Sequence, residues 1–371
     1  MAHIFTGADV FDGTTLHLAA SLRVDGGRVT GPGPGTEVRL NGGILAPGFL
    51  DLQVNGGGGQ MVDACCTPDR LAQLCATHAR MGATGILPTL ISDTPEATAK
   101  VIAAGIEATR RQTPGLLGLH LEGPHLDPRR KGAHGPTMIR PMTEDDLSLL
   151  LDAASKLPTL MVTLAPEAAT LDQIARLASA GVIVCLGHSD CSHATATAAI
   201  TAGARCVTHL FNAMSQLGPR EPGLVGAALT QPVHAGLIAD GIHVAPETIR
   251  IAMAAVPDRL FLVSDAMATA GSDLSEFQLN GRRILRKDGR LTLVDGTLAG
   301  ADLTLPRAVG VMIGLGTPVA VALAMASARP AACISRSDSL GHLQPGRVAD
   351  MVHLGNDGRL LGVWRAGDRL L

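Results

Sequence analysis

Short apolar runs alternate with Ala-rich segments along most of the chain. Residues 67–81, 94–111, 192–203 and 245–256 carry apolar residues at helical spacing, and several of these segments open on Thr, Ser or Pro before an acidic residue, a common start of a helix. The alternation predicts eight strand–helix units, the number found in a (β/α)8 barrel of the TIM type. The eight predicted strands are 44–54, 84–90, 116–122, 159–165, 182–188, 205–211, 235–240 and 260–265.

The two ends of the chain have a different pattern. Residues 1–45 and 345–371 contain short alternating pieces separated by Gly-rich turns, which predict a small β-domain formed by both termini. Residues 46–344 would then form the barrel, with a β-hairpin inserted near 276–294 around a Lys-Asp-Gly turn. A doubly wound open sheet is the structural alternative, but no GxGxxG motif follows the first strand.

Composition excludes several classes of function. Of the 371 residues 46% are hydrophobic and 17% are charged, which is typical of a chain with a large core. A net charge of −3, one Trp and no Tyr argue against nucleic-acid binding. The sequence contains no apolar stretch of about 18 residues, so we expect no membrane-spanning helix. The N-terminus lacks the features of a signal peptide, and the seven cysteines show no paired spacing, so we expect reduced thiols and a cytoplasmic location.

Four polar residues close apolar runs, where a buried strand would reach the surface. They are Glu122, His188, His209 and Asp265. Any one of them alone is more often a hydrogen-bonded rim residue or a helix cap. A barrel would bring the four together, and one carboxylate with two imidazoles can hold a divalent metal and leave a position open for water. A further carboxylate could transfer protons, so the pattern predicts a metal-dependent hydrolase.

Several motifs make the prediction more specific. The strings HLEGPH, GHSD, THLFNAM, PREPG, ADGIHV, SDAM and GTLAG, in this order, together with GHLQPGRVADMVHL near the C-terminus, cover most of the chain. This set resembles the N-acetylglucosamine-6-phosphate deacetylases of the amidohydrolase superfamily. The resemblance implies hydrolysis of the N-acetyl group of N-acetylglucosamine-6-phosphate to glucosamine-6-phosphate and acetate. It also implies a homodimer and one divalent metal, for which Zn²⁺ is favoured over Fe²⁺ or Mn²⁺.

The resemblance also assigns roles to residues. It implies that Glu122, His188 and His209 are the metal ligands, that Asp265 is the general base and acid, and that His243 polarises the acetyl carbonyl and contacts substrate. Arg220 matches a phosphate-binding arginine that in the family reaches across a dimer interface. The remaining substrate-contacting positions implied by the match are Ala133, His134, Asn212, Ala213, Leu298, Ala299 and Gly300.

Two departures from the superfamily pattern affect these expectations. Many amidohydrolases carry His-x-His after the first strand, whereas this chain has Gln53 and Asn55. Neutral amides are poor ligands for transition metals, so we expect one metal, as in deacetylases with the same Gln-x-Asn substitution. Gly135 stands where Asn is common, and the loop before Arg220 differs from the usual one, which leaves the identity of the sugar open.

Other polar residues receive structural interpretations. We expect His120 to pack deeper in the barrel behind Glu122, and the run Arg129–Lys131 to form a solvated loop. Ser189 and Asp190 are expected to cap the next helix. Three alternatives remain open: a deacetylase of N-acetylgalactosamine-6-phosphate or of an unphosphorylated amino sugar, a cyclic-amide hydrolase, and a sugar-phosphate-binding barrel without catalysis.

Overall fold

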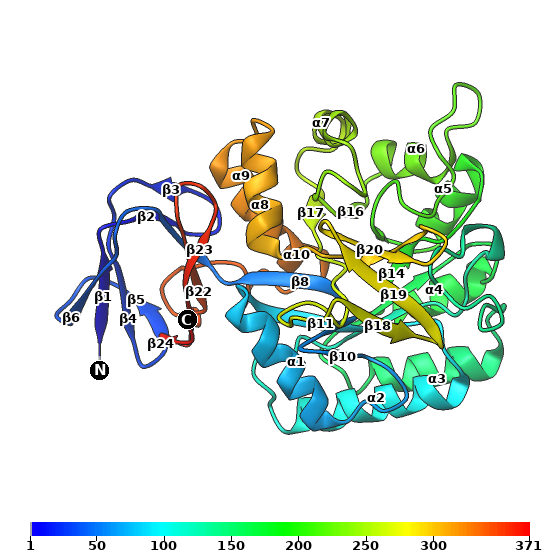
Figure 1. Cartoon of the computed structure of the whole chain (residues 1–371), viewed down its shortest axis with the longest axis horizontal. Coiled ribbons are helices and arrows are strands. Elements are labelled where there is room, and N and C mark those ends of the chain that lie inside the picture. Colours follow the sequence, from blue (N-terminus) through cyan, green and yellow to red (C-terminus); the bar gives the residue numbers. More distant parts are fainter. Residues whose placement is uncertain (1) are drawn as a thin grey trace.

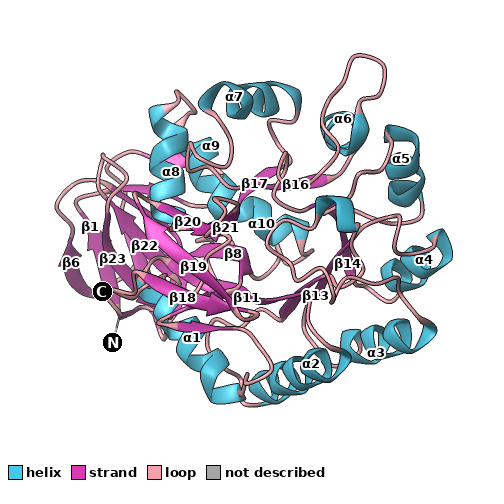
Figure 2. Cartoon of the chain, turned by 45° about the vertical axis from the view of Figure 1, so that its right-hand side comes forward, coloured by secondary structure: helices cyan, strands magenta, loops and turns pink. Residues whose placement is uncertain are grey.

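The computed structural model describes residues 2–371, and its centre is an eight-stranded parallel sheet. The strands pair in chain order, and a bridge between Val54 and Ala266 brings the first strand beside the segment that follows the last one. The sheet is therefore a nearly closed barrel, and helices lie around it between successive strands (Figures 1 and 2). This confirms the predicted fold class. The barrel strands are β8 (Phe49–Val54), β11 (Ala83–Ile91), β12 (Leu119–Glu122), β13 (Leu160–Leu164), β14 (Ile183–Leu186), β15 (Cys206–Val207), β16 (His234–Leu237) and β17 (Leu260–Leu262).

The helices begin where the sequence offers a cap. Thr67 and Thr94 accept hydrogen bonds from backbone amides of the first turns that follow them, and a proline comes directly after each. Ser192 caps the helix after β14, so the expectation that Ser189 or Asp190 would do so is wrong. The helices are α1 (Pro68–Arg80), α2 (Pro95–Arg110), α3 (Glu144–Ala154), α4 (Leu171–Ser179), α5 (His193–Thr201), α6 (Gly223–Thr230), α7 (Pro246–Ala255), α8 (Leu305–Gly314), α9 (Val319–Ala326) and α10 (Ala328–Cys333), with a short 3₁₀ turn η1 (Pro128–Arg130).

Two predicted strands differ from those observed. The run 44–54 is two strands, β7 (Ile44–Pro47) and β8, which belong to different sheets. At Gly48 between them, a Cβ atom would lie 2.1 Å from the Thr84 hydroxyl, so the close approach requires glycine. The run 205–211 shortens to the two residues of β15, because His209 and Phe211 have positive φ angles that end the extended backbone.

Strands from the two ends of the chain share a sheet. A six-stranded sheet has the order β24-β23-β22-β7-β2-β3, and a four-stranded sheet of N-terminal strands has the order β5-β4-β1-β6. Phe5 on β1 and Trp364 on β23 pack edge to face with ring centroids 5.4 Å apart and join the two sheets. The domain boundaries at residues 45 and 345 stay a prediction. The strands are β1 (His3–Thr6), β2 (Asp9–Phe11), β3 (Leu16–His17), β4 (Leu22–Asp25), β5 (Arg28–Thr30), β6 (Thr36–Arg39), β22 (Met351–Leu354), β23 (Leu360–Arg365) and β24 (Asp368–Arg369).

An antiparallel sheet lies over one end of the barrel (Figure 2). It contains β18 (Glu276–Leu279), β19 (Arg282–Lys287), β20 (Arg290–Leu293) and β21 (Leu298–Ala301). Its first two turns, Asn280-Gly281 and Asp288-Gly289, have positive φ at both residues, as tight hairpin turns of matching twist require. The barrel loop after β8 adds the short pair β9 (Gly56–Gly57) and β10 (Gln60–Met61). Within residues 2–371, no helix has the length and apolar character needed to cross a membrane.

Candidate active site

The four polar residues singled out in the sequence lie at the carboxyl ends of the barrel strands. Glu122 is the last residue of β12, whereas His188, His209 and Asp265 follow the ends of β14, β15 and β17. These last three have φ angles of 47°, 32° and 51°, in the left-handed region that non-glycine residues rarely adopt. Such strained backbone concentrates at functional sites, and here it occurs where each chain segment leaves the barrel.

Three side-chain atoms converge at this end of the barrel. Glu122 Oε1 lies 3.3 Å from His188 Nε2 and 3.0 Å from His209 Nε2, and the two nitrogens are 3.0 Å apart. The Nδ1 atom of His188 lies 2.8 Å from the Arg130 carbonyl oxygen, to which it donates, so a neutral ring keeps its Nε2 lone pair for a ligand. A tetrahedral Zn²⁺ with bonds of about 2.0–2.1 Å would hold its ligand atoms about 3.3 Å apart. The three residues therefore fit one divalent cation.

The ionisation of the cluster is consistent with a cation site. Burial would raise the pKa of Glu122, but its hydrogen bonds with His188 and His209 bring it well below its usual range. Burial would lower the pKa of His209, but the hydrogen bond and charge of Glu122 raise it overall. A proton thus holds the carboxylate and imidazole together, and a bound cation would take the place of that proton.

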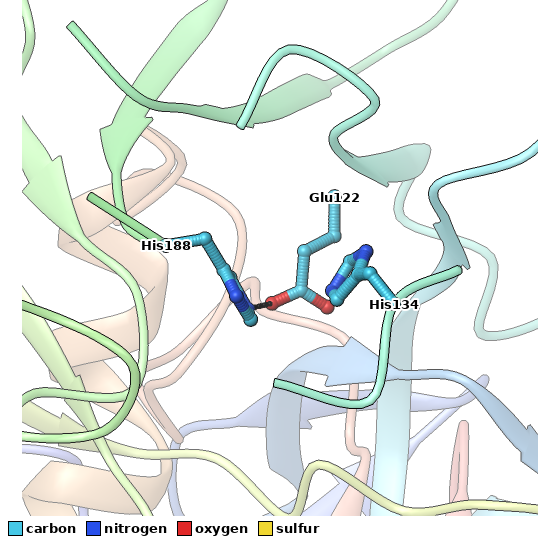
Figure 3. Close-up of side chains that lie close together, drawn as sticks. All are labelled: Glu122, His134 and His188. Carbon is cyan, nitrogen blue, oxygen red and sulfur yellow. Dashed lines mark hydrogen bonds and ion pairs between the residues drawn. The ribbon is translucent and has the colours of Figure 1, made fainter. Parts of the chain in front are cut away.

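His134 also lies close to these residues. One of its ring nitrogens is within 4.8 Å of ligand atoms of Glu122 and His188, and Figure 3 shows the Glu122 carboxylate between the two rings. The backbone N–H of Ser92 donates to His134 Nδ1 at 3.2 Å, so in the neutral ring Nε2 carries the hydrogen. Burial lowers the pKa of His134 to about 3, with the neighbouring His188 adding to the effect, and keeps the ring neutral. His134 is therefore a hydrogen-bond donor here rather than a metal ligand.

Asp265 lies beside the cluster in a buried, polar setting. Gln53 Nε2 and Asn55 Nδ2 donate to its Oδ1 atom at 3.2 and 2.6 Å. Burial raises the pKa of Asp265 to about 7, and the negative charge of Glu122 adds to the effect. A carboxyl group that titrates near neutral pH can both accept and release a proton.

His243 faces the same cavity from the loop after β16. Its Nδ1 atom lies 2.6 Å from Asp240 Oδ2, within hydrogen-bond distance. The Asp240 carboxylate also accepts hydrogen bonds from the backbone amides of Ile242 and His243, which fixes its position. The contact with Asp240 engages Nδ1 and leaves Nε2 free to face a ligand in the cavity.

The cavity at this site has a volume of about 540 Å³, enough for a sugar phosphate. Two residues expected at the substrate do not line it. Ala299 is buried and turned to the other face of β21, because successive strand residues point to opposite sides. Arg220 is exposed on the loop between β15 and α6, which projects beyond the barrel (Figure 2). The other expected residues do line it, namely Ala133, His134, Asn212, Ala213, His243, Leu298 and Gly300.

The basic run after β12 is not simply a solvated loop. Arg129 and Arg130 also line the cavity, and Arg129 is exposed to solvent as expected. Arg130 pairs with Asp190 at 2.6 Å, and Arg129 pairs with Asp127 at 2.6 Å. Asp127 lies two residues before Arg129 on the same loop, whereas Asp190 follows β14, so only the tertiary structure shows the Arg130–Asp190 pair.

His120 lies where the sequence placed it, deeper in the barrel than Glu122. Its Nε2 atom is 2.8 Å from the Thr163 hydroxyl, and its Nδ1 atom is 3.1 Å from the Leu52 carbonyl oxygen. The ring is 1% exposed, and burial lowers its pKa to about 4. His120 therefore supports the strand that carries Glu122 and does not reach the cavity.

A parallel barrel with a Glu/His/His cluster and a carboxylate at its carboxyl end defines a class of metal-dependent hydrolase. In agreement with this, residues 44–370 match the amidohydrolase family, and the chain belongs to it. The family match spans the barrel and the C-terminal strands.

Individual relatives within this family indicate which kind of amide bond is hydrolysed. The chain is 42% identical to an N-acetylgalactosamine-6-phosphate deacetylase of Shewanella sp. (strain ANA-3), over 90% of this chain and 84% of the relative. It superposes on the N-acetylglucosamine-6-phosphate deacetylase of Pasteurella multocida with a TM-score of 0.95 and 32% identity, over 100% and 99% of the two chains.

A third relative is an aspartate-to-alanine variant of the Mycobacterium smegmatis N-acetyl-D-glucosamine-6-phosphate deacetylase, in complex with N-acetyl-D-glucosamine-6-phosphate. It matches with a TM-score of 0.92 and 32% identity, over 100% and 99% of the two chains. The protein is thus an enzyme that hydrolyses the amide bond of an N-acetyl group, and the resemblance found in the sequence is confirmed.

Proposed function

We propose that the protein hydrolyses N-acetylglucosamine-6-phosphate to glucosamine-6-phosphate and acetate. The observation that carries the proposal is the convergence of Glu122, His188 and His209 within 3.3 Å, beside Asp265, in a cavity of about 540 Å³. The similar Mycobacterium smegmatis protein in complex with this compound supports the choice of substrate.

The proposed cofactor is one divalent cation held by Glu122, His188 and His209. Zn²⁺ suits this donor set, and Fe²⁺ and Mn²⁺ are the alternatives that metal analysis would distinguish. When bound, the cation supplies Lewis-acid activation of water and of the acetyl carbonyl. Gln53 and Asn55 donate hydrogen bonds toward carboxylates, which suits them to a role other than ligation of a second cation.

The chain's own residues then move the protons. Asp265 accepts a proton from the attacking water as the oxygen adds to the acetyl carbon. His243 Nε2–H donates to the carbonyl oxygen, where negative charge develops. Asp265 then gives the proton to the sugar nitrogen as the C–N bond breaks, which restores the Asp265 carboxylate. Acetic acid and the free amine leave, and the acid then loses its proton to the amine or to water to give acetate.

The walls of the cavity supply the remaining contacts in this proposal. Ala133, His134, Asn212, Ala213, Leu298 and Gly300 hold the sugar, with Ala299 supporting the wall from behind. The exposed Arg220 binds the phosphate in the site of a second subunit, within a homodimer. The seven free cysteines agree with a reducing, cytoplasmic location.

An acetate-release assay on the purified enzyme tests the substrate. We expect the highest kcat/KM with N-acetylglucosamine-6-phosphate, compared with its galacto epimer and the two unphosphorylated sugars. The galacto epimer is the second candidate, because the Shewanella relative, at 42% identity, carries that name. A higher kcat/KM with the galacto epimer would replace the proposed substrate, and equal values for phosphorylated and unphosphorylated sugars would remove the phosphate contact.

Arg220→Ala tests the homodimer and the phosphate contact together. Loss of a bidentate charged contact should raise KM for the phosphorylated sugar at least tenfold and leave KM for the unphosphorylated sugar unchanged. Light scattering should give the mass of a dimer for both proteins. A monomeric wild type that shows the same loss would contradict the assignment of Arg220 to the partner's site.

A further inference from the structure

One amide nitrogen lies between the two buried carboxylates of the site. Gln53 Nε2 donates to Glu122 Oε1 at 3.1 Å and to Asp265 Oδ1 at 3.2 Å. An amide NH₂ group has two hydrogens, and here each one meets a carboxylate oxygen. Gln53 is 1% exposed, so water does not compete for these hydrogens. The same side chain therefore contacts a proposed metal ligand and the proposed proton carrier.

Asn55 makes a simpler contact. Its Nδ2 atom donates to Asp265 Oδ1 at 2.6 Å, and the side chain is 1% exposed. An ionised carboxylate can only accept hydrogen bonds, which fixes the nitrogen rather than the oxygen of the amide toward Asp265. Gln53 and Asn55 thus share Asp265, whereas the bond to Glu122 belongs to Gln53.

The backbone holds both amides in place. The Gln53 N–H donates to the buried Asp51 carboxylate at 3.3 Å, and the same carboxylate accepts from the N–H of Ser264 at 3.2 Å. The Asn55 N–H donates to the Ala266 carbonyl oxygen at 2.8 Å. The end of β8 is therefore fastened to the residues on both sides of Asp265, and the two amides cannot swing away without breaking these bonds.

Two negative charges buried so close together repel each other, and water does not screen them. Amide hydrogens that point at both oxygens offset this repulsion and fix the direction of each carboxylate. We propose that Gln53 is a positioning residue that couples the metal site to the proton-transfer site, and that Asn55 positions Asp265 alone. This inference rests on the proposed function, because it assigns Glu122 to the metal and Asp265 to the protons.

The two amides can be separated by isosteric substitutions without donors. Gln53→Met should weaken metal binding, measured by competition with a chelator, and lower kcat, each by about 10- to 100-fold. Asn55→Leu should lower kcat by a similar factor while metal affinity and KM stay within threefold of wild type. Gln53→Asn keeps the amide but shortens its reach, and it should show the Gln53→Met pattern if the apolar variant does not fold.

A matched control lies on the next strand. Thr89 accepts a hydrogen bond from the Val54 N–H and is buried, but its hydroxyl contacts neither carboxylate. Thr89→Val should lower the melting temperature and leave metal affinity and kcat within threefold of wild type. Wild-type metal affinity in a folded Gln53→Met or Gln53→Asn variant would overturn the inference. Equal losses of metal affinity and kcat in the variants of Gln53, Asn55 and Thr89 would also overturn it.

Failure of the proposed function would look different. Glu122→Gln should lose its metal, and if this variant binds metal as wild type does, the proposed metal site is wrong whatever Gln53 does. If Glu122→Gln loses metal while the Gln53 variants keep both metal and turnover, only the role of Gln53 is wrong.

Discussion

Replacement of Asp265 by asparagine should stabilise the metal-free protein and nearly abolish turnover of the metal-loaded one. The Asp265 carboxyl is buried, and burial with the nearby Glu122 charge raises its pKa from 3.8 to about 7. A raised pKa means that the folded state binds the proton more tightly than the unfolded state. Stability contributed by the neutral carboxyl is therefore lost as the pH rises from 3.8 toward 7.

The size of the effect follows from the shift. Each pKa unit corresponds to about 1.4 kcal/mol. Relative to low pH, Asp265 therefore lowers the free energy of unfolding by roughly 4 kcal/mol at pH 7.5 and by about 2 kcal/mol at pH 5. Asparagine carries no charge, and its carbonyl oxygen can accept the same hydrogen bonds from Gln53 and Asn55. The gain in unfolding free energy should therefore be larger at pH 7.5 than at pH 5.

Urea denaturation of chelator-treated wild type and Asp265→Asn at the two pH values measures this gain. In the metal-loaded enzyme, loss of the proton carrier should lower kcat by about 10²–10⁴ while the metal content stays the same. Asp273→Asn, at an exposed position of the same connection, should change neither quantity. An equal gain at both pH values would refute the electrostatic reasoning, and a kcat within tenfold of wild type would refute the catalytic role.

Three further outcomes test the fold and the cofactor. Chelation should lower the melting temperature and activity together, with recovery on adding Zn²⁺; an unchanged melting temperature would argue against a structural contribution of the metal. Gly118→Ala should cost at least about 3 kcal/mol or prevent folding, because its Cβ would lie 1.9 Å from the Thr159 carbonyl oxygen at a φ of +140°. Gly181→Ala, with a positive φ but open space, should cost only about 1 kcal/mol in the same urea titration. Burial lowers the pKa of His78 to about 4, so on acidification the unfolded state takes up a proton before the folded state does. The free energy of unfolding should therefore fall by up to about 3 kcal/mol from pH 6.5 to pH 4, and His78→Gln should flatten this pH dependence.

Most of the architecture could be predicted from local sequence signals. Apolar runs of strand length and capped amphipathic segments depend on neighbouring residues alone, so the barrel and helix starts such as Thr67 and Thr94 could be predicted. Glu122 and Asp265 stood out for the same reason, since a polar residue after an apolar run marks the place where a strand leaves the core. The division of 44–54 at Gly48 escaped prediction, because the closeness of Thr84 is a tertiary contact.

The candidate site shows the same limit. Motif resemblance brought Ala299 and Arg220 into the expected contact set, but the face of β21 and the path of a projecting loop decide which side chains reach the cavity. The arginines of the basic loop, Arg129 and Arg130, also line the cavity, because Asp127 on the same loop and Asp190 after β14 hold them there.

The sequence by itself therefore determined where most strands and helices form and which polar residues stand at the strand ends, since both can be read from short-range patterns of apolar and polar residues. Only the tertiary structure decided the 3.0–3.3 Å spacing of the three ligand atoms, the raised pKa of Asp265 and the place of the Gln53 amide between two carboxylates. These depend on which strand ends meet when the barrel nearly closes. Closure brings β8 beside the segment after β17, residues more than two hundred positions apart, and it removes the water that would otherwise screen their charges.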